Sequence, residues 1–356
     1  MSLIPCDNKY EQDLSVFTEQ VLQRYGTSSE AAQREVMYLS DSGNVVAIKY
    51  CADLIFYGRI LRTNPYRDSF DIYLKAAGIE TDEEGNWSYS GVAYPLAFWD
   101  LAYFLLNYKR GSFLHNAEDI PKIDVIPEME RHVRALELAT TCLQYSKVPG
   151  AVNLVGRILK EASESEDAYE ILRDVISSNV SNRDFELIGL SALDCSSPDI
   201  CSEVADTFFK CAANQGYVYA CNNLAAKEAE RIIELKKAGA PEKEISDAIG
   251  VYTDYLKLSA DKYEPYAANR LGLFYRTGEI KCAGGREVFR EYTDSALAKE
   301  YFLRATVYPD ANSAWAFLNL IKYYYSDYEK DIDLMNEHME YIKKLNPEVY
   351  DIAIEL

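Results

Sequence analysis

The sequence predicts an all-α solenoid, a chain of helix-turn-helix repeats in which each pair packs on the next. Three observations predict it: a helical motif recurs along the chain, small residues recur within that motif, and the composition favours helices. The chain has 356 residues, of which 48% are hydrophobic, with only 11 Pro and 17 Gly. This composition excludes global disorder, and a solenoid can reach this length because each unit contacts only its neighbours.

The motif is clearest in YAANRLGLFYRTG, residues 266–278. Counted from Ala267, offsets 4, 8 and 11 fall on one stripe of a helix, at about 100° per residue. Offset 5, which is Gly272, turns toward a second neighbour. The same offsets recur from seven leading residues, which are Ala47, Ala97, Ala151, Glu186, Ala220, Ala267 and Ala314. This recurrence predicts an array of repeats.

Small residues dominate offset 5 of the first helix in each unit. The residues at this offset are Ala52, Ala102, Gly156, Ser191, Ala225, Gly272 and Asn319. The second helix of each unit mixes aromatic and small residues, as in Ala205, Phe208, Phe209, Ala212 and Ala213. We therefore expect the bulk of one helix to pack against small residues of its neighbour. The expected packing positions are Ala52, Ala102, Gly156, Ala225 and Gly272.

The N-terminal part predicts a helix pair that resembles a degenerate repeat. A helical stripe within residues 8–25 consists of Tyr10, Leu14, Phe17, Val21 and Tyr25. Gly26 is expected to end this helix, and Thr27 with Glu30 forms a predicted capping box for a helix over about residues 28–40. We interpret residues 1–40 as a capping pair, residues 41–345 as the solenoid and residues 346–356 as a C-terminal tail.

Insertions are expected between helices, because the distance between leading residues varies from 34 to 54. The longest insertions span residues 79–93, 112–127 and 279–291. Loops of this length normally lie on the surface, so we expect three surface loops.

The motif AxxxLGxxYxxG at residues 267–278, with AxxFFxxAAxxG at residues 205–216, resembles the Sel-one-like repeat family, relatives of the tetratricopeptide repeats. The resemblance covers about residues 40–345. It implies a right-handed α-α superhelix of about seven to eight repeats. Members of this family hold proteins together without chemistry of their own, so the resemblance also implies a scaffold rather than an enzyme.

Some members of that family are secreted and cross-link their helix pairs through two cysteines eight residues apart. Cys221 fits the second of these positions, whereas Ala213 occupies the first. The N-terminal sequence MSLIPCDNKYEQDL lacks the basic and apolar regions of a secretory signal. These features favour a reducing compartment, and we expect the protein in the cytoplasm.

The charge balance argues against several classes of partner. With 57 Asp and Glu against 37 Lys and Arg, the formal net charge is -20, which repels phosphate groups. We therefore expect neither nucleic acid nor a membrane as a partner. The most apolar run, residues 92–108, contains Pro95 and Asp100 and is expected to be a buried helix. The acidity either favours a basic partner or only keeps the chain soluble, and both interpretations stay open.

The sequence predicts no metal, cofactor or catalytic residue. The eight cysteines form no CxxC pair, and His115, His132 and His338 lie far apart along the chain. Zinc would need four converging ligands, so reduced, packed thiols are the simpler interpretation. No Ser, Cys or His stands in a recognisable nucleophile motif.

Offset 2 of the first helix predicts the partner-binding side, because it points about 200° away from the leading residue. In tetratricopeptide relatives this side lines the concave groove. The residues at offset 2 are Lys49, Trp99, Asn153, Ile188, Asn222, Asn269 and Ala316. An Asn amide both donates and accepts a hydrogen bond, as the backbone of an extended peptide requires. We hypothesise a binding ladder of Asn153, Asn222 and Asn269, flanked by Trp99, Tyr266 and Arg276; the alternative is that these Asn are simply exposed polar residues.

These features together favour a non-catalytic scaffold or adaptor that binds a peptide or protein, basic or polar in character, on its concave face. Two alternatives remain. A glycan-binding module would stack sugars on Trp87, Trp99 or Tyr side chains, and a hydrolase would act on a peptide or glycan with acidic groove residues. The sequence does not identify the partner.

Overall fold

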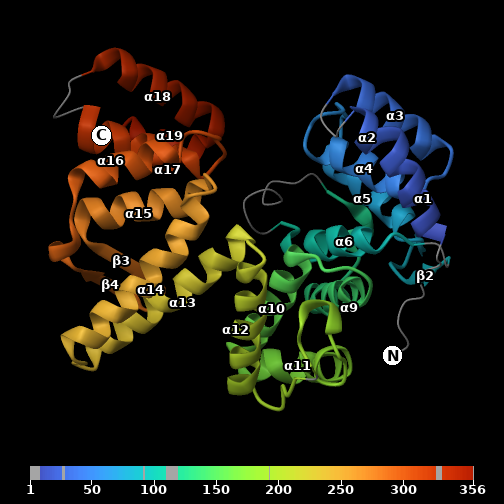
Figure 1. Ribbon diagram of the computed structural model, residues 1–356, viewed down its shortest axis with the longest axis horizontal. Coiled ribbons are helices and arrows are strands. Elements are labelled where there is room, and N and C mark those ends of the chain that lie inside the picture. Colours follow the sequence, from blue (N-terminus) through green and yellow to red (C-terminus); the bar gives the residue numbers. More distant parts are fainter. Residues whose placement is uncertain are drawn as a thin grey trace. The chain divides into compact units, whose positions relative to one another are not determined.

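The computed structural model describes residues 9–25, 29–90, 93–109, 119–191, 193–325 and 331–355 (Figure 1). The chain divides into two compact units, Met1–Phe208 and Phe209–Leu356. The predicted all-α class is confirmed, because the described part of each unit consists of helices and one short β-hairpin. The boundaries near residues 40 and 345 and the hand of the superhelix stay predictions.

Unit 1 is a series of helices in which each packs on the next along the chain. Its helices are α1 (Lys9–Phe17), α2 (Gln23–Tyr25), α3 (Glu30–Asp41), α4 (Val45–Phe56), α5 (Pro65–Ala76), α6 (Pro95–Asn107), α8 (Pro121–Asp124), α9 (Glu128–Tyr145), α10 (Pro149–Ser163) and α11 (Glu166–Ile176). Strands β1 (Ile79–Thr81) and β2 (Trp87–Tyr89) form its hairpin. Helix α12 (Pro198–Asn214) begins in unit 1 and ends in unit 2.

Unit 2 repeats this arrangement, and its helices again contact their neighbours in chain order. Its helices are α13 (Val218–Lys237), α14 (Glu242–Ala260), α15 (Pro265–Thr277), α16 (Ser295–Arg304), α17 (Ser313–Leu320), α18 (Ile332–Leu345) and α19 (Pro347–Ala353). Strands β3 (Glu279–Cys282) and β4 (Gly285–Val288) form its hairpin. None of the helices described in either unit is long and apolar enough to cross a membrane.

Six of the seven predicted leading residues lie in helices, namely in α4, α6, α10, α13, α15 and α17. Each of these six alanines is 0% exposed: Ala47, Ala97, Ala151, Ala220, Ala267 and Ala314. The predicted helical register is therefore confirmed in these six helices.

The seventh predicted start, Glu186, is wrong. Glu186–Ile188 form a single 3₁₀ turn that ends at Gly189 with φ of +74°. Phe185 and Leu190 then pair in an isolated β-bridge. A left-handed residue ends a helix, so the positions predicted for Ile188 and Ser191 on a first helix do not exist.

Two of the three predicted surface loops instead contain hairpins, which corrects the prediction for residues 79–93 and 279–291. In the first, Ile79 pairs with Tyr89, and in the second Glu279 pairs with Val288. A two-stranded hairpin alone is marginally stable in water, so each depends on the helices beside it. In the third loop, residues 110–118 lie outside the described residues.

The structure also differs in detail from the predictions for the two ends of the chain. Gly26 and Thr27 lie outside the described residues, and α3 is capped by Ser29, whose Oγ accepts from the Ala32 N–H at 3.1 Å. The predicted C-terminal tail contains helix α19. Val349 of this helix is buried in an apolar cluster with residues of α17 and α18.

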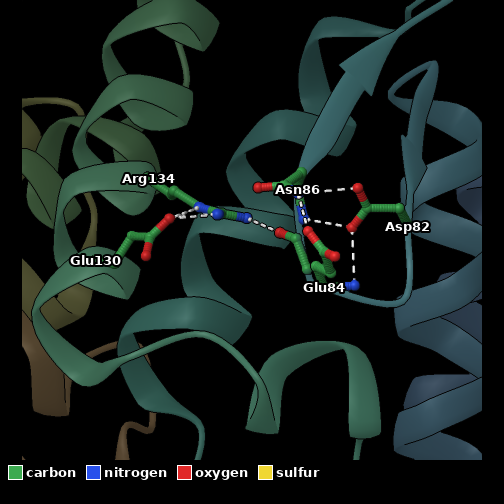
Figure 2. A network of polar contacts seen from close by, with 6 residues as sticks. Asp82, Glu84, Asn86, Glu130 and Arg134 are labelled. Carbon is green, nitrogen blue, oxygen red and sulfur yellow. Dashed lines mark hydrogen bonds and ion pairs between the residues drawn. The ribbon is translucent and has the colours of Figure 1, made fainter.

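Arg134 of α9 fixes the β1–β2 hairpin in unit 1 (Figure 2). Its Nη1 donates to the Gly85 carbonyl at 2.7 Å, and its Nε donates to Glu130 at 3.1 Å. Within the turn, Asp82 Oδ1 accepts from the Asn86 N–H at 2.8 Å. The turn is thus held by its own polar groups and by one side chain of the helix beside it.

Close helix approach is seen most directly at Gly272 in α15. A Cβ added to this residue would lie 2.5 Å from Cδ1 of Phe302 in α16. Gly272 is buried and Phe302 is 0% exposed, so neither side of the contact has free space. The ring therefore occupies the volume that any larger residue at position 272 would need.

We predict that Gly272→Ala lowers the free energy of unfolding by about 1–3 kcal/mol, because the ring of Phe302 must shift. Gly250 on α14 is the matched control, since a Cβ there meets nothing within 4 Å. Gly250→Ala should instead stabilise by about 0.5–1 kcal/mol, the usual gain for a helix interior. Urea denaturation measures both variants, and equal effects would contradict this account of the contact.

A buried charge cluster links α4 and α6 in unit 1. Lys49 Nζ lies 2.8 Å from Asp53 Oδ2 and 3.3 Å from Asp100 Oδ2. Tyr73 of α5 donates to Asp53 Oδ1 at 2.8 Å. Burial raises the pKa of Asp100 to about 8, and Lys49 opposes this shift. One ammonium thus faces two carboxylates, and a proton on Asp100 relieves their repulsion.

We predict a pH-dependent contribution of Asp100 to stability. An unfolded Asp titrates near about 4, so the folded state alone holds this proton between about pH 4 and pH 8. The contribution of Asp100 to stability is complete below about pH 4 and is lost as the pH rises to about 8. The difference in unfolding free energy, wild type minus Asp100→Asn, should therefore fall between pH 5 and pH 8.5 in denaturation experiments.

Asp82→Asn is the control for this experiment, because hydrogen bonds from Asn86 lower the pKa of Asp82 and move its titration below the window. Its difference from wild type should stay constant. Parallel pH profiles for wild type and Asp100→Asn would contradict the assignment.

Candidate functional site

Unit 2 contains a groove of about 490 Å³ between α13, α14, α15 and the β3–β4 hairpin. The lining residues are Asn222, Ala225, Ala226 and Glu230 of α13, Tyr252 and Leu256 of α14, Tyr266 and Arg270 of α15, and Lys281, Cys282 and Ala283 of the hairpin. Helices α13 and α15 are the first helices of successive pairs, so the groove follows from the repeat. The β3–β4 hairpin, which borders the groove, belongs to the insertion over residues 279–291.

The floor of the groove is apolar. Ala225, Tyr252 and Leu256 are almost completely buried. The Tyr252 ring meets Phe274 edge to face, with 6.1 Å between ring centroids. Burial also raises the pKa of the Tyr252 hydroxyl, which therefore stays neutral at physiological pH.

Glu264 joins the two walls at one end of the groove. Its Oε2 accepts from the Ala267 N–H at 2.7 Å and from Asn222 Nδ2 at 3.0 Å. Burial raises the pKa of this carboxyl, and these same hydrogen bonds oppose the shift. Because Glu264 accepts, the amide of Asn222 must turn its NH₂ group toward it. Asn222 Oδ1 is left buried and makes no hydrogen bond within the described chain.

The hairpin is attached to both walls near the other end. Arg270 Nη2 donates to the Lys281 carbonyl at 2.6 Å, which fixes β3 to α15. Lys237 Nζ donates to the Gly284 carbonyl at 2.8 Å, which fixes the turn to α13. The hairpin therefore bridges the two helices that form the walls.

The structure brings together two of the six predicted partner-binding residues. Asn222 and Tyr266 both line the groove, and Tyr266 is 40% exposed. Asn269 is 9% exposed, and its Oδ1 accepts from Asn319 Nδ2 at 2.9 Å. The Arg276 guanidinium donates to Ser295 Oγ at 3.3 Å and lies 5.2 Å from the ring centre of Tyr323.

The other two predicted partner-binding residues belong to unit 1. Asn153 of α10 is 5% exposed. Trp99 of α6 is half-buried and packs on Gly150 at the start of α10, where an added Cβ would lie 2.6 Å from its ring. Two of the three Asn of the ladder are thus buried rather than on an open face.

The predicted packing residues lie inside their units. Ala52 and Ala102 are 0% exposed and Ala225 is 1% exposed. Gly156 and Gly272 are buried in α10 and α15. Ala225 also forms part of the groove floor, so this residue both packs between helices and lines the candidate site.

The sequence interpretation missed Glu230, Arg270, Lys281 and Cys282 as groove residues. Arg270 is the next residue after Asn269, at offset 3 of the motif. Arg270 faces the groove, whereas Asn269 faces α17. The insertion at residues 279–291 was the available signal, because long inserted segments often border binding sites.

The described residues hold no group of three or more His, Cys, Asp or Glu side chains that could bind a metal ion. His132 contacts Glu161 at 2.9 Å, whereas His338 lies against the rings of Phe317 and Tyr325. Seven cysteines of the described chain are free thiols, including Cys282 in the groove.

A comparison of the sequence with protein-family models finds no match. A comparison with curated proteins finds none either. Among solved structures, the chain is similar to a Sel1 repeat protein from Oxalobacter formigenes, at 15% identity and a TM-score of 0.46, over 94% of this chain and 99% of that one. A TM-score below 0.5 is a weak likeness, so the functional conclusions below rest on the contacts of this chain.

We predict that Asn269 and Asn319 stabilise unit 2 as a pair. Asn319→Ala should cost about 1–2 kcal/mol, because Asn269 Oδ1 loses its buried donor. The double variant with Asn269→Ala should cost less than the sum of the single variants, by about 1 kcal/mol. Urea denaturation of all four proteins measures this coupling, and strictly additive losses would show that the pair does not interact.

Proposed function

We propose that this protein is a scaffold that binds an extended peptide segment of a partner protein in the groove of unit 2. One observation carries the proposal: a groove of about 490 Å³ with an apolar floor and a few polar groups at its ends. Ligand-binding pockets commonly have this size and composition. The proposal thus assigns partner binding, which the sequence placed on a concave face, to the groove of unit 2.

The shape of the groove supports a peptide as ligand. Asn222 and Glu230 lie on the same helix, and eight residues of helix correspond to about 12 Å. An extended chain advances about 3.3 Å per residue, so three to four residues fit along the wall. The exposed ring of Tyr266 offers an amphipathic surface at the entrance, of the kind enriched in interfaces.

The polar groups of the groove suit binding rather than catalysis. Asn222 and Arg270 are held in place by hydrogen bonds to Glu264 and to the Lys281 carbonyl. Such fixed groups lower the entropic cost of binding a ligand. The free thiols suit a reducing compartment, and we place the proposed scaffold in the cytoplasm.

We predict that Tyr266→Ala weakens peptide binding at least about tenfold, because the aromatic contact at the entrance of the groove is lost. The probe is a peptide selected from a random display library on the full chain, and fluorescence polarisation measures its affinity. Tyr38→Ala is the control, since Tyr38 lies on α3 in unit 1 and is 67% exposed. Equal affinity of all three proteins would contradict a site at Tyr266.

Cys282 gives a second readout of the same binding. The selected peptide should slow alkylation of Cys282 by iodoacetamide. Cys51 and Cys211 are also partly exposed thiols, lie outside the groove and should react at an unchanged rate. A peptide that binds without protecting Cys282 occupies another surface and contradicts the proposal.

A further inference from the structure

We propose that the hairpin end of the groove binds the C-terminal carboxylate of the peptide, through the side chains of Arg270 and Lys281. This inference rests on the proposed function and names the part of the peptide that the groove selects. It follows from two unpaired cations, from the hairpin that bridges the walls, and from the charge of the rest of the chain.

Four other cations of unit 2 have carboxylate partners, and Lys237 is bound to the Gly284 carbonyl outside the groove lining. Arg231 pairs with Glu228, Arg286 with Glu279, Arg304 with Asp261 and Lys257 with Asp254. Within the described residues, Arg270 and Lys281 form no ion pair, and both line the groove. In a chain with a net charge of -20, two cations in one groove that have no carboxylate partner among the described residues favour the binding of an anion there.

The guanidinium of Arg270 is prepared for this role. The Lys281 carbonyl occupies one of its five N–H donors, which fixes the plane of the group. Arg270 is partly buried and lines the groove together with Tyr252 and Tyr266. Partial removal from water strengthens the attraction between a guanidinium and a carboxylate.

The hairpin explains why the carboxylate should be a chain terminus. β3 contacts both α13 and α15, and in Figure 1 the hairpin lies beside these helices. Its turn is attached to α13 through Lys237 and its first strand to α15 through Arg270. A peptide that enters between Asn222 and Tyr266 meets the hairpin and cannot continue along the same line. Its last residue therefore lies next to the two cations.

Glu230 is expected to restrict which side chain the peptide can carry next to its C-terminus. It is the one carboxylate that lines the groove, and among the described residues it forms no ion pair. It repels an acidic side chain beside the terminus and accepts a backbone N–H or a basic side chain. The preferred ligand thus ends in a free carboxylate that is not preceded by Asp or Glu.

The experiment uses two pools of N-acetylated tetrapeptides with random sequence, one with free C-terminal carboxylates and one with C-terminal amides. The readout is the rate at which iodoacetamide alkylates Cys282 in the full chain, measured by mass spectrometry, with Cys51 and Cys211 as internal controls. The acid pool should halve this rate at a concentration about tenfold lower than the amide pool, as loss of one charge-assisted contact implies.

Lys281→Gln should remove most of this difference between the pools, because it removes a cation while the backbone carbonyl that Arg270 binds is retained. Lys243→Gln is the matched control and should preserve the difference, because it removes an exposed cation of α14 that does not line the groove. Arg270→Met also removes the bond to the hairpin, so its result is interpreted only beside that of Lys281→Gln.

The possible outcomes separate the inference from the proposed function. Equal protection by both pools keeps the peptide site but overturns the carboxylate. A third pool, amidated and with Glu fixed at its last position, overturns the terminal position if it protects as well as the acid pool. If no pool protects Cys282 and no display-selected peptide does so, the proposed function itself is wrong.

Discussion

Close approach between neighbouring helices is the constraint on which the rest of this structure depends. Helices can meet at short distance only where side chains are small, and six alanines at equivalent places are completely buried. At Gly272 the space that a side chain would fill is taken by Phe302. Because α15 packs on α16 through this contact, its other side, with Tyr266 and Arg270, is available to line the groove.

The helical part of the fold could be predicted because it depends on local periodicity. Ala267, Leu271 and Gly272 place one helix face by spacing alone, and the same spacing locates five further helices. Glu186 satisfied that spacing only in part, and the left-handed Gly189 ended the helix there. The hairpins could not be predicted because their pairing depends on nearby helices, as the bond from Arg134 to the Gly85 carbonyl illustrates.

The site was predicted less well, for a physical reason that Asn269 makes clear. Its place on the helix suggested a groove residue, but its amide is paired with Asn319, fifty positions along the chain. Periodicity reports the direction of a side chain and not the residue it meets. Asn222 and Tyr266 both line the groove. Arg270 was missed because an inserted hairpin, and not the repeat, supplies the carbonyl that it binds.

The attachment of the β3–β4 hairpin has a consequence for how such a chain can change. Both bonds from the walls, from Arg270 and from Lys237, end on main-chain oxygens, at Lys281 and Gly284. Those oxygens are present whatever side chains the two residues carry. Mutations of the hairpin side chains can therefore change ligand selectivity while the two backbone hydrogen bonds that attach the hairpin are retained. The insertion can thus diverge in sequence without losing its position on α13 and α15.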